Sequence, residues 1–492
     1  PIYSDNLDYT FILLSPRILT DLPQPQNLFD TFLNQLADWN QAGQLLITNL
    51  SVDPLSIPSR LGRGQELWRL CEEINRKLQE HSDRIPWFHI IDLKGFLIQH
   101  GLTQLHDPRY EMTGRFYFHP NASKLLAEYI LRYLRALTVS PKKLLAIDLD
   151  NTLWGGVLGE DGLNGIRLGG ESEGYAFVRF QRALKSLKEN GVLLALVSKN
   201  NQEDALEAIR KHPDMALKLE DFVTYRINWD PKPQNLISIS KELGLTVDSF
   251  VFFDDSDFER QMMRDTIPEV EVINVPADPA YYVQALSDYP GFDSLHVTTE
   301  DHSRTEMYHA EFERTRLQKK AVTQDDFFRD LQMRAFIQEV NIDGLVRVHQ
   351  LINKTNQFNL TTKRYTESQL AELLRSERFA LFAIRLQDKL GESGTIGVMI
   401  VEKQPNQWRL DSFLLSCRII GRTLEFALMR WLTNKAKEDG VANIWAEFVP
   451  TRKNNVAKDF LAAASFESLK NGKWQLNLEK HPKLPKDYVT VV

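Results

Sequence analysis

The chain has 492 residues, more than one hydrophobic core normally holds, and roughly 100 to 200 residues per domain predicts three or four domains. Its 43% hydrophobic and 25% charged residues are typical of a globular protein, and no apolar run reaches the roughly 18 residues of a membrane span. The formal charge of −7 gives no general attraction for nucleic acid or an anionic membrane, so we expect neither as a partner. Cys71 and Cys417 fit neither a metal-ligand spacing nor a disulfide framework, which favours a reducing compartment and a cytoplasmic protein.

Residues 1–140 alternate strand-like apolar runs with amphipathic helical stretches, which predicts an α/β layer. The runs lie at 12–15, 44–51 and 88–94, and the last helical stretch is KLLAEYILRYLRAL.

The next region, 141–299, opens with a Pro-Lys-Lys break and then alternates strands with helices, which predicts a parallel, doubly wound sheet. Residues 300–330 are predicted to be a charged connecting helix, and 331–492 a further domain of mixed strands and helices. We expect strands in KLLAI, VLLALVS, FVTYRIN and SFVFF, and helices over 173–190, 202–211 and 233–243.

Two carboxylates follow the first strand of that region, in LLAIDLDNTLWGG. The carboxyl ends of strands are where open α/β sheets bind ligands. Asp148 can attack phosphorus, while Asp150 can donate a proton to the leaving oxygen and later activate water. Thr152, two residues further on, is a candidate for substrate binding.

Later strand ends supply the groups that an anionic nucleophile needs when it meets an anionic phosphate. Ser198 can hydrogen-bond a phosphate oxygen, and Lys232 can neutralise charge. Asp254 and Asp255 offer hard oxygen ligands, so we expect Mg²⁺ held by the four carboxylates of Asp148, Asp150, Asp254 and Asp255. This order and spacing resemble the haloacid dehalogenase (HAD) phosphatase superfamily, all four of whose motifs lie between 148 and 255.

The alternative for DLDNT alone is a strand followed by an Asx turn, but Ser198, Lys232 and the later aspartates in register favour the phosphotransfer site. The short interval between Asp148 and Ser198 leaves no room for a large cap domain. An uncapped site admits a bulky substrate or a carrier arm.

A narrower resemblance rests on DLDNTLWGGVLGEDG, SKNN, HPDMALKLEDF, RINWDPKPQNL and FVFFDDSDFERQ. Together they resemble the FkbH-type glyceryl transferase/phosphatase family of polyketide pathways, from 144 to about 470. The resemblance implies that 1,3-bisphosphoglycerate loses its phosphates while its glyceryl unit becomes a thioester on an acyl carrier protein. Ser256 and Asp257 depart from the Asn-Pro that we expect after the paired aspartates, and the extra carboxylate could shift metal affinity.

In the C-terminal domain, strand WRLDSFLLS leads into CRIIGRTLEFALMRW, a glycine turn that opens a helix. Arg418, Gly421 and Arg422 stand where helix N-terminal amides would face an anion. This resembles the GNAT acyltransferase fold, whose Arg-x-x-Gly-x-Gly/Ala turn cradles the pyrophosphate of acyl-coenzyme A. Thr423 replaces the final small residue, which would suit a phosphopantetheine arm better than coenzyme A.

Cys417 is a candidate nucleophile, because neighbouring arginines and a helix N-terminus lower a thiol pKa. The alternative is a small buried residue, and its place in a motif of the FkbH family favours the catalytic role. The polar segment 353–365 matches the same family, and Asn353, Thr355, Asn356, Gln357 and Asn359 line the cleft or form a capped turn.

GRFYFHPNASKLLAEYI, in the N-terminal segment, resembles the last block of SGNH hydrolases. Phe116 stands where that family has its catalytic aspartate, and the serine would precede Pro1. We therefore predict a non-catalytic remnant in which His119 is a structural turn residue.

These features predict a two-site enzyme: Asp148 removes a phosphate from a three-carbon substrate, and Cys417 transfers its acyl group to an acyl carrier protein. A Mg²⁺-dependent phosphatase without acyl transfer, and a carrier-binding scaffold, are the alternatives.

Overall fold

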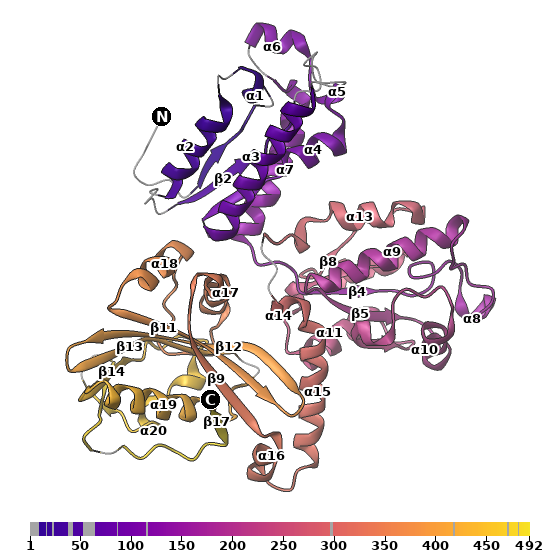
Figure 1. Ribbon diagram of the computed structural model, residues 1–492. Coiled ribbons are helices and arrows are strands. Elements are labelled where there is room, and N and C mark those ends of the chain that lie inside the picture. The colour runs from indigo at the N-terminus through magenta and orange to yellow at the C-terminus, as the bar shows by residue number, and fades with distance from the viewer. Residues whose placement is uncertain are drawn as a thin grey trace. The chain divides into compact units, whose positions relative to one another are not determined.

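Three sheets organise the described part of the chain, each with helices packed on it (Figure 1). Cys417, Arg418 and Phe116 lie outside the described residues. The computed structural model describes all residues except 1–8, 16, 22–23, 38–42, 53–63, 86, 115–116, 296–298, 417–418, 470–471 and 481.

The N-terminal sheet has three parallel strands in the order β1-β2-β3. β1 begins three residues earlier than the strand predicted at 12–15, and it ends at Ile12 because the Leu14 amide donates to the Thr48 hydroxyl at 2.8 Å instead of to a strand. The elements are β1 (Tyr9–Ile12), α1 (Ile18–Asp21), α2 (Pro25–Ala37), β2 (Gln44–Thr48), α3 (Gly64–Arg84), β3 (Phe88–Ile91), α4 (Leu93–His100), α5 (Leu102–Leu105), α6 (Pro108–Gly114) and α7 (Pro120–Thr138).

The second sheet has five parallel strands in the order β6-β5-β4-β7-β8, as the strict alternation of strands and helices predicts. Its strands are β4 (Leu144–Ile147), β5 (Leu193–Ser198), β6 (Phe222–Ile227), β7 (Phe250–Phe253) and β8 (Glu271–Val272). Its helices are α8 (Leu158–Asp161), α9 (Ser172–Glu189), α10 (Gln202–Lys211), α11 (Lys232–Leu243), α12 (Asp257–Thr266) and α13 (Tyr282–Asp288).

Both faces of this sheet are covered, which explains why its strands are apolar without interruption. Alternate residues of β4 enter two separate cores: Leu145 and Ile147 pack with α9, α10 and α13, while Leu144 and Ala146 pack with α11 and α12. Figure 1 shows α9 and α11 on opposite sides of β4 and β5. The edge at which the strands end is therefore the place left for a site.

The stretch 300–330 contains three helices where one was predicted: α14 (Thr299–His302), α15 (Arg304–Lys320) and α16 (Gln324–Leu331). α16 starts anew because Thr323 caps it, accepting a hydrogen bond from the Asp326 amide at 3.1 Å. The turn 387–394 packs with these helices through a buried, two-pronged ion pair between Arg314 and Asp388, at 2.6 and 2.9 Å.

The C-terminal sheet is mixed, with nine strands: eight run in the order β15-β16-β14-β13-β12-β11-β9-β17, and β10 pairs with β13. The α/β fold class is thereby confirmed, with two parallel sheets and a mixed one. The strands are β9 (Met333–Glu339), β10 (Phe358–Asn359), β11 (Phe379–Asp388), β12 (Gly391–Gln404), β13 (Gln407–Leu415), β14 (Asn443–Glu447), β15 (Glu467–Ser468), β16 (Lys473–Asn477) and β17 (Val489–Val491). The helices are α17 (Leu345–Lys354), α18 (Glu367–Arg375), α19 (Leu424–Glu438) and α20 (Phe460–Ala463).

Strand β13 changes partner along its length. Its first half pairs in parallel with β14 as far as Leu410, and its end, Leu414–Leu415, pairs with β10. The Leu360 amide extends this second pairing by donating to the Phe413 carbonyl at 3.1 Å. None of the helices in the described ranges is both long and apolar enough to cross a membrane.

Candidate active site

The polar residues that follow β4, β5, β6 and β7 converge on the carboxyl edge of the five-stranded sheet. Asp148 directly follows β4, Ser198 ends β5, Lys232 begins α11 after β6, and Asp254 follows β7. All four are at least nine-tenths buried, with exposed fractions of 7, 2, 3 and 0%. Asp148, Lys232 and Asp254 are in contact there, and the phosphate-binding role of Ser198 stays a prediction.

Three carboxylates form a compact oxygen cluster at this edge. Asp148, Asp254 and Asp255 each offer one oxygen, and these oxygens lie within 4.8 Å of one another. Carboxylate oxygens at this spacing fit one hard divalent cation, because such a cation prefers several oxygen ligands. Of the four predicted metal ligands, the structure brings these three together.

Lys232 lies between two of these carboxylates. Its Nζ atom is 2.8 Å from Asp148 Oδ1 and 2.5 Å from Asp254 Oδ2. Burial opposes the charged form of Lys232, but the charges of Asp148 and Asp254 outweigh burial and raise the lysine pKa. The ammonium is therefore a fixed positive charge beside Asp148.

Burial also raises the pKa of Asp254 and of Asp255, and the charge of Asp148 adds to both shifts. Three neighbouring carboxylates share one ammonium, so the ionised form of all three together is disfavoured without a further positive charge. A bound cation would supply that charge and hold all three carboxylates ionised.

The turn after β7 orients the paired aspartates. The Ser256 amide donates to Asp254 Oδ1 at 3.0 Å, and Arg260 Nη1 donates to the carbonyl oxygens of Asp254 and Asp255 at 2.6 and 2.8 Å. Asp257, the extra carboxylate of this motif, has a side chain that is 97% exposed and paired with Arg260. It is outside the oxygen cluster, and Ser256 caps α12.

Asp150 lies apart from the three-carboxylate cluster and is held by three donors. Its Oδ1 accepts from Trp154 Nε1 at 2.9 Å and from the Leu158 amide at 3.1 Å, and its Oδ2 accepts from Asn200 Nδ2 at 2.9 Å. Burial raises the pKa of Asp150, and the three hydrogen bonds oppose that shift. Its role as a metal ligand stays a prediction.

The turn between Asp150 and α8 is closed by local hydrogen bonds. Asn151 has a positive φ of 52°, and its Oδ1 accepts from the Gly156 amide at 2.9 Å. Tyr282, from α13, donates to the Asn151 carbonyl at 3.0 Å. Thr152 is fully buried and donates to Asp255 Oδ1 at 3.3 Å, so it orients a carboxylate of the cluster.

A backbone bridge closes the base of residues 156–166, an excursion of the chain that follows the turn after Asp150. Gly155 and Arg167 exchange two hydrogen bonds, at 3.0 and 2.7 Å, at the base of this excursion. The excursion contains only the short helix α8, in agreement with the prediction that no large cap follows Asp148.

The glycine turn of the C-terminal domain precedes α19 as predicted. Gly421 and Thr423 have positive φ values of 81° and 63°, and Arg422 between them is buried. Glu425, in the first turn of α19, has a pKa raised by burial. The binding role predicted for Gly421, Arg422 and Arg418 stays a prediction.

The polar segment before Tyr365 is held by turn-type hydrogen bonds. Asn353 donates to the Tyr365 carbonyl at 3.1 Å, and Asn359 accepts from the Thr362 amide at 2.8 Å. Asn356 accepts a hydrogen bond from Arg364. These contacts fit the capped-turn alternative, and the substrate role of Asn356 stays a prediction.

His119 occupies a turn in the N-terminal domain. Its Nδ1 accepts hydrogen bonds from the amides of Asn121 and Ala122, at 2.9 and 3.4 Å, at the start of α7. A histidine that caps a helix in this way is a structural residue, as predicted.

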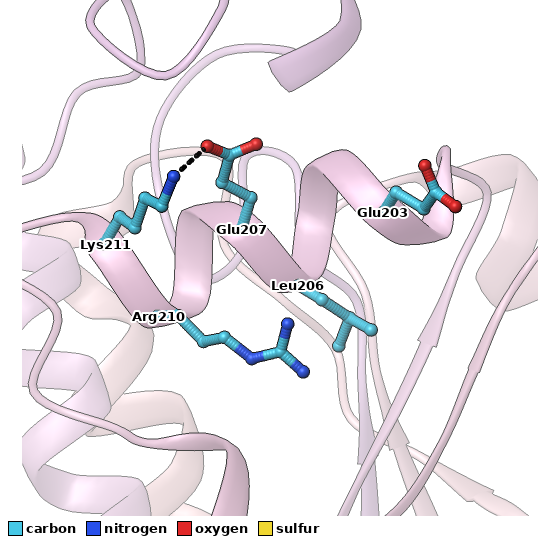
Figure 2. A pocket seen from close by; sticks show the side chains of 5 residues that line it. All are labelled: Glu203, Leu206, Glu207, Arg210 and Lys211. Carbon is cyan, nitrogen blue, oxygen red and sulfur yellow. Dashed lines mark hydrogen bonds and ion pairs between the residues drawn. The ribbon is translucent and has the colours of Figure 1, made fainter.

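A hollow of about 300 Å³ lies beside α10 (Figure 2). Lys211 and Glu207 pair across its rim at 2.6 Å. None of its lining residues belongs to the aspartate site, so the hollow does not mark the chemistry. They are Glu203, Leu206, Glu207, Arg210 and Lys211.

Comparison with known proteins gives one informative likeness. No family model and no curated protein matches this sequence. The crystal structure of the N-terminal part of BF1531 from Bacteroides fragilis, which contains a phosphatase domain complexed with Mg, has 28% sequence identity and a TM-score of 0.52 over 59% of this chain and 80% of that chain. The ribosomal-protein-S18-alanine N-acetyltransferase from Escherichia coli has 16% identity over 29% of this chain and 94% of its own. Its TM-score of 0.24 is too low to support a conclusion about this chain.

Strand order, the buried aspartate after β4, and the lysine and carboxylates after β6 and β7 define an HAD-like phosphatase domain. The likeness to the BF1531 phosphatase structure agrees with that assignment.

Asn200, Trp154 and Tyr282 belong to the site without having been predicted from the sequence. Asn200 stands in the quoted motif SKNN, and Trp154 in DLDNTLWGG, so a local signal existed for both. Tyr282 is 131 residues from Asn151 and has no such signal.

Proposed function

We propose that residues 141–299 form a Mg²⁺-dependent phosphatase that works through an aspartyl-phosphate on Asp148. The observation that carries this proposal is the cluster of Asp148, Asp254 and Asp255 with Lys232 beside it. A buried nucleophile next to a fixed ammonium and two further carboxylates suits an anionic substrate only if a cation is also bound.

Each residue has a distinct task in this reaction. Asp148 attacks phosphorus, Lys232 offsets negative charge, and the Ser198 hydroxyl donates to a phosphate oxygen. Asp150 protonates the leaving oxygen and then takes a proton from the attacking water. Mg²⁺, held by Asp148, Asp254 and Asp255, would neutralise the approaching phosphate.

The test is phosphate release from p-nitrophenyl phosphate by the full chain, with and without Mg²⁺. We expect turnover that requires the metal. Absence of turnover from this ester and from alkyl monoesters, at saturating Mg²⁺, would contradict the proposal.

We further propose that the physiological substrate is 1,3-bisphosphoglycerate and that the product is a glyceryl thioester on an acyl carrier protein in polyketide biosynthesis. The support is the resemblance to the FkbH-type family in five motifs between 148 and 261, and the short excursion 156–166, which leaves room for a carrier arm. The acyl phosphate is already activated, so no other energy source is needed.

In this reaction the Cys417 thiolate attacks the carbonyl carbon of the acyl phosphate. The carbon–sulfur bond forms as the carbon–oxygen bond to phosphate breaks, and phosphate leaves. The thiolate of the carrier's phosphopantetheine arm then attacks the thioester, and Cys417 is released as a thiolate. The exchange is nearly balanced in energy because one thioester replaces another.

A GNAT-like fold for 331–492 is part of this proposal. It is supported by the parallel pair β13 and β14 with α19 between them in sequence, and by the glycine turn at 421. That turn, with Arg418 and Arg422, would receive the phosphate of the carrier arm.

Intact mass spectrometry after incubation with 1,3-bisphosphoglycerate tests the transfer. We expect an adduct with the mass of a glyceryl or phosphoglyceryl group, which hydroxylamine removes and which Cys417→Ala lacks. An acyl adduct of this mass that persists in Cys417→Ala, or that maps to Cys71, would contradict the cysteine step. A phosphatase without acyl transfer would release phosphate and carry at most a phosphoryl group on Asp148, and a carrier-binding scaffold would neither release phosphate nor form an adduct.

A further inference from the structure

Three donors converge on one carboxyl group, that of Asp150. Trp154 Nε1 and the Leu158 amide both donate to Oδ1, at 2.9 and 3.1 Å, while Asn200 Nδ2 is the one donor to Oδ2 among the described residues, at 2.9 Å. Trp154 is fully buried and Asn200 is 5% exposed. Solvent therefore competes little for these hydrogen bonds, and the carboxyl group has one fixed orientation.

The two oxygens of Asp150 differ in what they can still accept. A carboxylate oxygen has two lone pairs in the plane of the group. Within the part of the chain that the structure describes, Oδ1 has two donors, one for each lone pair, whereas Oδ2 has one donor and one remaining lone pair. A proton added to Asp150 therefore bonds to Oδ2, and in that state Oδ2 still accepts from Asn200.

We propose that Asp150 transfers its proton through Oδ2 alone, and that Trp154 and Asn200 are the positioning residues that select this oxygen. The inference rests on the proposed phosphatase function and adds to it the oxygen that carries the proton and the side chains that aim it. Neither Trp154 nor Asn200 contacts the reacting atoms in this assignment. Both act through Asp150.

Asp150 loses a proton in the first half-reaction and regains one in the second. In the first, the Oδ2–H bond breaks and the proton passes to the bridging oxygen as its bond to phosphorus breaks and Asp148 bonds to phosphorus. In the second, Oδ2 accepts a proton from water as the water oxygen bonds to phosphorus. The bond between phosphorus and Asp148 then breaks, and both aspartates return to their starting states.

Asn201, the neighbour of Asn200 in sequence, provides a matched control, because it stabilises a helix and is not one of the donors that position Asp150. Its Oδ1 caps α10 by accepting from the amides of Glu203 and Asp204, at 2.9 and 3.4 Å. Two adjacent asparagines thus have different tasks: Asn200 holds a catalytic carboxyl group, and Asn201 begins a helix.

The test compares two esters whose leaving groups differ in their need for a proton. p-Nitrophenolate leaves without protonation, whereas the alkoxide of glycerol 3-phosphate does not. With Mg²⁺ present, Asn200→Ala and Trp154→Phe should lower kcat/KM for glycerol 3-phosphate roughly tenfold or more, and for p-nitrophenyl phosphate by less than about threefold. Asn201→Ala should leave the ratio of the two values as in the wild type.

Circular dichroism and thermal unfolding show whether each variant is folded. If Asn200→Ala does not fold, Trp154→Phe, which keeps an aromatic ring at the buried position, tests the proposal. An equal fall of kcat/KM for both esters in a folded variant would overturn the positioning role. A wild-type chain that hydrolyses neither ester would instead refute the phosphatase function itself.

Discussion

The Tyr282 hydroxyl donates a hydrogen bond to the Asn151 carbonyl oxygen at 3.0 Å and so fixes, from another helix, the turn that follows Asp148 and Asp150. Tyr282 is 2% exposed and packs edge-on against Phe180 and Phe253. Tyr282→Phe keeps the ring and removes this hydrogen bond. It should cost about 1 kcal/mol of unfolding free energy and lower kcat more than it changes KM.

Urea unfolding and steady-state kinetics measure the two effects of Tyr282→Phe. Tyr281→Phe is the control, because the side chain of Tyr281, the residue before Tyr282, is 55% exposed. Equal kinetics for both variants would show that the turn needs no fixation by α13.

Asp148→Asn should abolish phosphate release, since an amide cannot form the aspartyl-phosphate. A loss of about 1,000-fold or more in kcat is expected. Asp150→Asn should still be phosphorylated but turn over slowly, so rapid-quench experiments should find more phosphoenzyme than in the wild type. Wild-type rates in Asp148→Asn would refute its assignment as nucleophile.

Removal of divalent cations should stop phosphate release, and Mg²⁺ should restore it. At a concentration 100 times its Kd, Mg²⁺ should stabilise the fold by about 2.7 kcal/mol, seen as a rise in Tm. Asp255→Asn should reduce this rise. Asp257→Asn should not, since the Asp257 side chain is 97% exposed and outside the cluster.

Mg²⁺ affinity should also depend on pH, with a sign set by the carboxylates. The folded-state pKa values of Asp254 and Asp255 are raised, so these groups gain protons as the pH falls toward the acidic range, and protons compete with the cation. The apparent Kd for Mg²⁺ should therefore increase from pH 8 to pH 6. A Mg²⁺ affinity that does not depend on pH would contradict the raised pKa values of Asp254 and Asp255.

Cys71 should not react with thiol reagents in the native protein. It is 1% exposed, its Sγ donates to the Leu50 carbonyl, and burial raises its pKa to about 11. Iodoacetamide at pH 8 should modify it roughly 100-fold more slowly than free cysteine. Peptide mapping before and after unfolding measures this difference, and rapid native modification of Cys71 would contradict it.

Asp388→Asn should destabilise the fold through Arg314. Both side chains are buried, so the substitution leaves a buried guanidinium with weaker compensation, at a cost of roughly 3 kcal/mol or more. Lys389→Ala removes the neighbouring surface pair with Asp330 and should cost at most about 1 kcal/mol. Denaturant unfolding of both variants checks the contrast, and equal losses would refute it.

Local patterns predicted the arrangement of the candidate site well, because Asp148, Ser198 and Asp254 stand at the ends of buried strands. Asp148 and Ser198 are one residue after β4 and the last residue of β5, as the apolar runs LLAI and LLALVS indicate. Parallel pairing then brings these ends together without further information.

Residues that act through long-range contacts could not be predicted in the same way. Tyr282 reaches Asn151 only because α9 and α13 pack on one face of the sheet, and no periodicity in the sequence encodes that contact. Asn356 was selected for its polarity, yet an asparagine in a turn and one in a cleft have the same local pattern. The structure, not the sequence pattern, shows that Asn356 accepts a hydrogen bond from Arg364.

The bridge between Gly155 and Arg167 isolates a short length of chain beside the nucleophile. Because its two hydrogen bonds close the base, residues can be added at the tip without moving Asp148 or Asp150. Substrate range and chemistry are then separable properties of this domain. In the proposed phosphatase, a longer excursion grafted between 162 and 165, beyond the Leu158 amide that holds Asp150, would narrow the choice of ester while the same aspartates perform the reaction.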